Sequence, residues 1–187
     1  MASPLNGYHA AHLPEGPARA VVWKVVAEHL ASWVAPDAHV LEIGAGYCEW
    51  INNVTASRRV AIGIWPEIAP LASNILEHFE PAVASSVVED INRLLKPGGR
   101  LIVVQPNFRY AAKHYFDGYT HRSVFTDASL PNLLRAHGFR VDRVEPRFLP
   151  YSMRGSKLPI RAWTVRAYLR SPIKPMAGQM LDVASKA

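Results

Sequence analysis

The hydrophobic pattern alternates between helical and strand spacing from the first part of the chain. Apolar residues recur every three or four positions over 17–34, which predicts a helix. A short apolar strand is predicted at 39–43, where the chain reaches Gly44-Ala45-Gly46, and helical spacing resumes over 47–54. The opening pattern therefore indicates a strand, a glycine turn and a helix in that order.

The rest of the chain continues this alternation. Strands are predicted at 60–64, 101–106, 140–148 and 179–184, with the end of a further strand at 71–74, and helices at 82–95, 126–138 and 161–170. Thr126 and Asp127 offer a helix cap, and Gly138 fits a left-handed helix end. Strands that alternate with helices indicate an α/β fold with a mostly parallel sheet, and the length of 187 residues fits a single domain over 1–187.

The glycine turn is the feature that points most directly to a ligand. Glycines let backbone N–H groups and a helix start approach a bound molecule closely. A dinucleotide fingerprint needs a third glycine where this chain has Glu49, whose carboxylate would repel a pyrophosphate. A Gly-Lys-Ser/Thr phosphate loop is also absent from the sequence after the turn. NAD, FAD and nucleoside triphosphates are therefore disfavoured.

Two motifs resemble those of the class I S-adenosylmethionine-dependent methyltransferases, and most closely the small enzymes of the type 11 group. They are Val40-Leu-Glu-Ile-Gly-Ala-Gly46 and Leu94-Leu-Lys-Pro-Gly-Gly-Arg-Leu101. The resemblance covers 17–148 and 178–184, and it implies a Rossmann-like sheet with helices on both faces. It also implies a C-terminal antiparallel strand pair, with 147–177 as a basic insertion between the last two strands.

The resemblance implies S-adenosylmethionine as the cofactor. In the family, an acidic residue on the first strand and two glycines hold the methionine half, and a turn after the fourth strand lines the methyl-donating end. An aromatic residue after the second strand is placed to cover the adenine. The candidate cofactor-binding residues are accordingly Glu42, Gly44, Ala45, Gly46, Tyr47, Trp65 and Asn74.

The chain departs from the family after the second strand. Gly63 stands where the family has an acidic residue that binds the ribose, and Glu67 is the nearest substitute. Only 65–70 separates the second strand from the segment at 71–74, whereas a parallel connection normally needs a dozen or more residues. We therefore expect an internal deletion after the second strand and a sheet without the usual third strand.

Residues after the fifth strand of the family pattern are the candidates for catalysis, because open α/β sheets bind substrates there. His121 is placed to take a proton from a hydroxyl acceptor, Asp117 to orient it and Arg122 to hold an anionic group. The candidate catalytic residues are His121, Asp117 and Tyr119, and the candidate substrate residues are Tyr115, Arg122 and Asn107. A hydrogen-bonded loop scaffold is the alternative. Glu77 is expected to be solvated or capping, and His78 to be structural.

Charge is distributed unevenly along the chain. The net charge is +6, and residues 135–187 hold 11 Lys and Arg against 3 Asp and Glu. This basic segment suggests an anionic partner, either a small substrate or a membrane surface contacted through 154–174, and a solvated basic face is the alternative. No RNA-recognition motif is present, so a nucleic acid is not expected.

These patterns lead to one predicted function and one rival. We expect methyl transfer, by O-methylation, to a small acceptor that is anionic or lipid-linked. The rival is a degenerate, non-catalytic binding module whose cofactor site is impaired. The single cysteine and the lack of an apolar leader in 1–15 favour a cytoplasmic protein, and a shortened sheet edge invites a homodimer.

Overall fold

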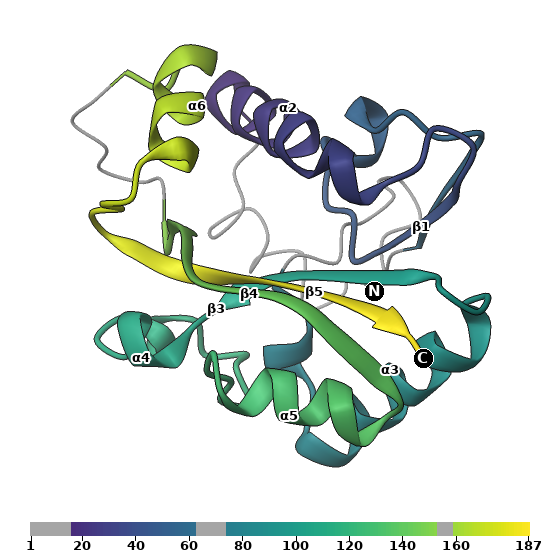
Figure 1. Ribbon diagram of the computed structural model, residues 1–187. Helices are drawn as coiled ribbons and strands as arrows, with labels where there is room; N and C mark the ends of the chain where they lie inside the picture. The colour runs from purple at the N-terminus through teal and green to yellow at the C-terminus, as the bar shows by residue number, and fades with distance from the viewer. Residues whose placement is uncertain (1–15, 63–73, 153–158) are drawn as a thin grey trace, which may run out of the picture.

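Helices cover both faces of a central layer of strands (Figure 1). The computed structural model describes residues 16–62, 74–152 and 159–187. Helices α2 (Pro17–Leu30) and α6 (Ala162–Arg170) lie on one side of this layer. Helices α3 (Pro81–Leu94), α4 (Phe108–Ala111) and α5 (Ser129–Ala136) lie on the other. The predicted α/β class, with helices on both faces, is confirmed.

The described strands form one parallel pair and one antiparallel sheet, whereas the sequence predicted a mostly parallel sheet. Strands β1 (His39–Ile43) and β2 (Arg58–Ile62) are parallel. Strands β3 (Arg100–Pro106), β5 (Ala177–Lys186) and β4 (Phe139–Pro150) pair in that order, and β5 is antiparallel to both neighbours. The predicted C-terminal antiparallel pair is therefore confirmed. Strands β3 and β4 run in the same direction because β5 opposes each of them.

Strand β5 separates two hydrophobic cores. Leu181 and Val183 point to the core that contains the apolar side chains of α2 and α6. Met180 and Ala184 point to the core beneath α3 and α5. Burial on both faces explains why the apolar residues of this strand occur next to one another and do not simply alternate with polar residues.

Most predicted elements are present, with one clear exception after the glycine turn. The chain over 47–50 forms turns instead of a helix, and only η2 (Ile51–Asn53), a short 3-10 helix, follows. Cys48 has a positive φ of 57°, a conformation that an α-helix does not accommodate. The helix predicted at 47–54 was therefore wrong. Within the described ranges, the other 3-10 helices are η1 (Ala31–Trp33), η3 (Leu76–His78) and η4 (Tyr115–Asp117).

Several predictions, including the ribose-site residues Gly63 and Glu67, lie partly or wholly outside the described residues. Positions 63–64 of the predicted second strand, positions 71–73 and Trp65 all belong to the stretch 63–73 that is not described. The expected deletion and missing third strand therefore stay predictions. Directly after this stretch, the backbone N–H of Asn74 donates to the carbonyl of Val104 at 3.0 Å, which places Asn74 beside β3.

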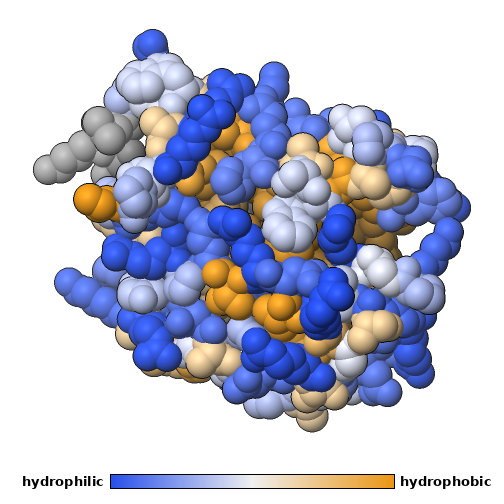
Figure 2. Space-filling model, viewed as in Figure 1, coloured by the Kyte–Doolittle hydropathy of each residue, from blue (hydrophilic) through white to orange (hydrophobic). Residues whose placement is uncertain are grey.

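The basic segment between β4 and β5 is shorter than expected and partly folded onto the core. Because β4 continues to Pro150, the connection spans 151–176 rather than 147–177. Val165 and Leu169 of α6 are buried in the core shared with α2, and Arg166 forms an ion pair with Glu28 of α2 at 2.8 Å. The face shown in Figure 2 is mainly hydrophilic, with hydrophobic patches between the charged side chains. None of the described helices is both long and apolar enough to cross a membrane.

Candidate functional site

The glycine turn after β1 has the backbone that its sequence predicts. Gly44 and Gly46 have positive φ angles of 82° and 43°, a region that residues with a Cβ rarely adopt. The N–H of Gly44 donates to Ile62 of β2 at 2.9 Å, and the N–H of Cys48 donates back to Ala45 at 2.7 Å. The turn is therefore fixed at both ends, against the neighbouring strand and against itself.

Glu42 lies buried beneath this turn. Its side chain is only 3% exposed, and its Oε2 accepts the backbone N–H of Ile51 at 3.2 Å. Its Oε1 is buried without a hydrogen-bond partner among the described residues. Burial raises the pKa of Glu42 to about 8, against the opposing effects of the Ile51 N–H and of Arg19. A donor or cation from a ligand would satisfy this oxygen.

Arg19 of α2 lies across the turn, and the sequence reasoning did not include it. Its guanidinium forms an ion pair with Glu49 and lies 5.9 Å from the centre of the Tyr47 ring. A Cβ added to Gly46 would come within 3.1 Å of the Arg19 Nη2 atom. Arg19 is visible in the sequence only as an interruption of an apolar helix, and nothing in that pattern relates it to the turn. A depression of about 440 Å³ lies here, lined by Gly16, Pro17, Ala20, Tyr47 and Glu49.

A second group of candidates gathers around η3. The backbone N–H groups of Arg122 and Ser123 both donate to the carbonyl of Glu77, at 2.7 and 3.0 Å. These bonds hold the loop after η4 against η3. The His121 ring consequently packs edge-on against His78 and Tyr115, with centroid distances of 4.9 and 4.6 Å.

Glu77 is the buried acid of this group, contrary to the expectation of a solvated or capping residue. Its side chain is 0% exposed, and neither carboxylate oxygen has a hydrogen-bond partner among the described residues. Burial raises the pKa of Glu77 to about 8. The expectation failed because the chain over 118–123 covers η3, a tertiary contact that the local sequence does not encode.

His121 is also removed from water. Burial, reinforced by neighbouring His78, lowers the pKa of His121 to about 4. The ring is therefore neutral at pH 7 and has a lone pair to share. A group with so low a pKa is a weak general base, since efficient bases have a pKa near the working pH.

The other candidates of the loop differ in exposure. Tyr115 is fully buried and its hydroxyl donates to the carbonyl of Ser123 at 2.5 Å, so it packs under the loop. Asp117 pairs with His114 at 3.0 Å, and its side chain is 72% exposed. Tyr119 is exposed, and Arg122 lies 3.6 Å from Glu80 at the surface. Of these residues, the structure brings Tyr115 and His121 into direct contact.

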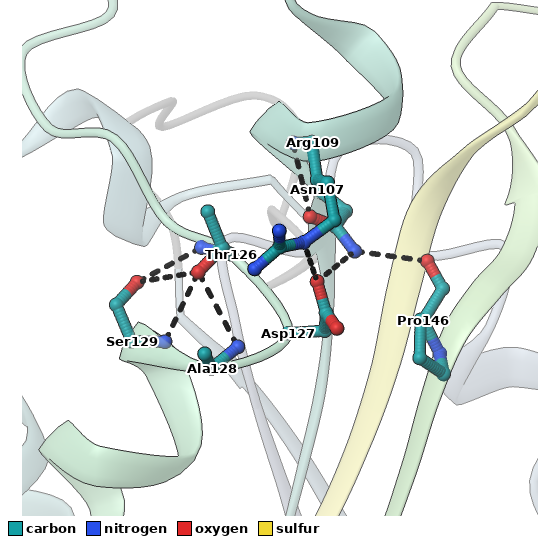
Figure 3. Close-up of polar contacts among 7 residues, drawn as sticks. All are labelled: Asn107, Arg109, Thr126, Asp127, Ala128, Ser129 and Pro146. Carbon is teal, nitrogen blue, oxygen red and sulfur yellow. Dashed lines mark hydrogen bonds and ion pairs between the residues drawn. The ribbon is translucent and has the colours of Figure 1, made fainter.

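Asn107 follows β3 and is committed to structural hydrogen bonds (Figure 3). Its amide nitrogen donates to Asp127 and to the carbonyl of Pro146, each at 3.0 Å. Its amide oxygen accepts the N–H of Arg109 at 3.2 Å, which caps the start of α4. The side chain is fully buried, so it joins three segments of the chain and does not face a surface open to substrate.

Comparison with known proteins places the fold. No family model matches the sequence, and no curated protein matches it either. A SAM-dependent methyltransferase from Archaeoglobus fulgidus superposes with a TM-score of 0.62 at 15% identity, covering 98% of this chain and 100% of the other. The chain has the class I methyltransferase fold. Similarity at this identity shows the fold alone, because one fold supports many activities that depend on the residues of the site.

Two further methyltransferase structures resemble the chain. One is a SAM-dependent protein from Thermotoga maritima described as a "possible histamine N-methyltransferase", with a TM-score of 0.58, 18% identity and coverage of 98% of this chain and 96% of the other. The other is the mitomycin 7-O-methyltransferase MmcR, with a TM-score of 0.55, 14% identity and coverage of 91% and 54%. Of these two neighbours, one is thus described as a possible N-methyltransferase and the other as an O-methyltransferase.

The predicted cofactor residues of this methyltransferase fold fall into two places. Glu42 to Tyr47 form the turn described above. Asn74 has a left-handed backbone, with φ of 58°, and its buried Oδ1 has no hydrogen-bond partner among the described residues. Trp65 lies outside the described residues.

Proposed function

We propose that this protein binds S-adenosylmethionine at the turn formed by Glu42 to Tyr47 and transfers its methyl group to an oxygen atom of a small acceptor. The observation that carries the proposal is the buried Oε1 of Glu42, which lacks a partner beneath a turn with two left-handed glycines. The cofactor has an ammonium group and a sulfonium, so the Oε1 atom can accept a hydrogen bond from that ammonium group, whose positive charge also favours the ionised form of Glu42.

The surroundings of the turn support the same ligand. Arg19 provides a guanidinium beside Gly46, suited to the carboxylate of the methionine half. The depression of about 440 Å³ next to Tyr47 and Glu49 falls within the usual size range of small-molecule sites. When bound, the cofactor supplies an electrophilic methyl group. The chain then has to position an acceptor, since in-line transfer depends mainly on orientation.

The acceptor is proposed to be a hydroxyl group, as in the mitomycin 7-O-methyltransferase neighbour. A hydroxyl must lose its proton as the methyl group arrives, so it needs a group that accepts or stabilises that charge. The neutral ring of His121, in the loop after η4, is a weak base but has a lone pair that can accept a hydrogen bond from that hydroxyl, and Arg122 lies at the surface for an anionic acceptor. Asp117 and Tyr119 are exposed beside them and are proposed to contact the acceptor.

Calorimetric titration with S-adenosylmethionine and S-adenosylhomocysteine tests the cofactor site. We expect micromolar binding to the wild type and a loss of at least about 100-fold in Gly46→Asp, whose new carboxylate would face that of the ligand. Gly98→Asp is the matched control, because Gly98 also has a positive φ, of 72°, and a Cβ there meets nothing within 4 Å. Its binding should equal that of the wild type.

The outcomes separate the enzyme from its rival. An absence of heat with folded wild-type protein at millimolar ligand would identify a non-catalytic module on a methyltransferase scaffold. An equal loss of cofactor affinity in Gly46→Asp and Gly98→Asp would show that backbone strain, and not a changed contact at the turn, weakens binding. With binding established, incubation with matched phenol and amine acceptors distinguishes oxygen from nitrogen as the methylated atom.

A further inference from the structure

Three side chains outside the glycine turn carry metal-binding atoms at one place in the fold. Glu77 and His78 come from η3, and His121 comes from the loop after η4. Each offers one ligand atom, and these atoms lie within 4.8 Å of one another. We propose that Glu77, His78 and His121 bind a divalent transition-metal ion.

The carboxylate of Glu77 is the first argument. It is completely buried, and neither of its oxygens has a hydrogen-bond partner among the described residues. Buried carboxylates in proteins are paired with a cation, hydrogen-bonded or coordinated to a metal. The arginine of the adjacent loop does not serve as that cation, because the Arg122 guanidinium is directed at Glu80. The groups that do face the cluster are imidazoles, which are metal ligands in their neutral form.

The two histidines are oriented in a way that suits coordination. The Nδ1 of His78 lies 3.3 Å from the carbonyl oxygen of Thr120, a distance at which it donates a hydrogen bond. A histidine that donates from Nδ1 to a carbonyl carries its lone pair on Nε2, which is the tautomer that most metal-ligating histidines show. The Nδ1 of His121 is buried without a hydrogen-bond partner among the described residues. His78 therefore has the tautomer of a metal ligand, and His121 has a ring nitrogen without a hydrogen-bond partner among the described residues.

The backbone is already in place, and the side chains need only a small adjustment. Zinc bonds to nitrogen and oxygen ligands are about 2.0–2.2 Å long, which puts tetrahedral ligand atoms about 3.4 Å apart. The ligand atoms of the three side chains now lie within 4.8 Å of one another, and rotation about side-chain bonds would bring them to the shorter separation. The hydrogen bonds from Arg122 and Ser123 to the Glu77 carbonyl keep the two segments together meanwhile.

The donor set selects the class of metal. Two imidazoles and one carboxylate favour zinc, manganese or iron over calcium and magnesium, which prefer oxygen ligands. Three protein ligands leave a position for water or for an acceptor oxygen. This inference does not depend on methyl transfer, because the same three residues would hold the ion whether or not S-adenosylmethionine binds.

Metal binding to the chelator-treated full chain tests the proposal directly. We expect calorimetry with zinc chloride, repeated with manganese chloride, to show one ion bound per chain. His78→Ala, His121→Ala and Glu77→Gln should each weaken this binding by about 100-fold or more, since each removes a ligand. Zinc should also raise the thermal midpoint of the wild type and not that of the three variants.

His114→Ala is the matched control, because His114 is an exposed histidine paired with Asp117 outside the cluster. Its zinc affinity should equal that of the wild type. Circular dichroism of each metal-free variant confirms that it is folded, and Glu77→Gln preserves the shape of the side chain if an alanine variant does not fold. Absence of binding to the wild type at millimolar zinc, or unchanged affinity in a folded ligand variant, would overturn the proposal.

Discussion

Asp182 offers a direct test of how burial controls the stability of this fold. It lies in the middle of β5, its side chain is 0% exposed, and neither of its oxygens has a hydrogen-bond partner among the described residues. Burial, with a smaller contribution from Asp127, raises the pKa of Asp182 from 3.8 to about 7, while Arg135 opposes the shift. The folded state therefore holds a proton on this carboxyl that the unfolded state releases at a much lower pH.

The sign and size of the effect follow from this shift. Between about pH 4 and pH 7 the folded state binds more protons than the unfolded state, so the free energy of unfolding falls as the pH rises. A shift of about 3 pKa units corresponds to about 4 kcal/mol, fully expressed above pH 7. Asp182→Asn removes the charge, although its buried amide costs about 1–3 kcal/mol for lack of partners. The variant should therefore gain stability, relative to the wild type, by about 3 kcal/mol between pH 5 and pH 8.

Urea denaturation of both proteins across this pH range measures the difference. For a chain of this length, about 3 kcal/mol corresponds to a change of about 6–12 °C in the relative thermal midpoint. Asp37→Asn, at an exposed position, is the control and should follow the wild-type curve. If the difference between Asp182→Asn and the wild type stays constant from pH 5 to pH 8, Asp182 does not titrate as a buried acid and the reasoning is wrong.

Two further substitutions test local structure. Asn107→Ala removes two donated hydrogen bonds and one accepted one, so it should lower the free energy of unfolding by about 2–3 kcal/mol in urea denaturation. Loss of turnover with unchanged stability would instead show that Asn107 acts on substrate. Gly138→Ala should lower the free energy of unfolding by about 1 kcal/mol, because φ is 79° at this position, while the added Cβ would lie 3.5 Å from its nearest atom, Asn92 Nδ2, and so has room. An unchanged thermal midpoint would contradict the left-handed helix end.

Local signals in the sequence predicted the elements whose residues decide their own conformation. Gly138 ends α5 with a left-handed backbone as expected, and the strand at 101–106 is extended by one residue only, to Arg100. Glycines at 44 and 46 likewise adopt the turn that their lack of a Cβ permits. In each case, the steric preference of a few neighbouring residues is enough to determine the structure.

Contacts between distant segments account for what the sequence did not reveal. Asn107 was a substrate candidate because it follows a strand, yet its amide is used by Asp127 and Pro146. The burial of Glu77 depends on a loop more than forty residues away in the sequence, and Arg19 reaches the glycine turn from helix α2. Such pairings depend on how elements pack, which spacing and composition do not specify.

The basic segment illustrates the same point for charge. Its excess of arginine and lysine suggested one anionic binding surface, but several of these cations have their own acidic partners in the fold. Arg140 pairs with Asp142, Arg143 and Lys174 both pair with Glu145, and Arg166 pairs with Glu28.

These ion pairs lie at separate places, some along β4 and one on the outer side of α6. A polybasic surface attracts a membrane through charges that act together within a Debye length, whereas locally paired charges largely cancel at that distance. The apolar side of α6 is occupied as well, because Val165 and Leu169 are buried against α2 and only Trp163 is left as a large exposed apolar side chain on the helix. For the described residues of this segment, the arrangement therefore favours a solvated basic face over a membrane-binding helix.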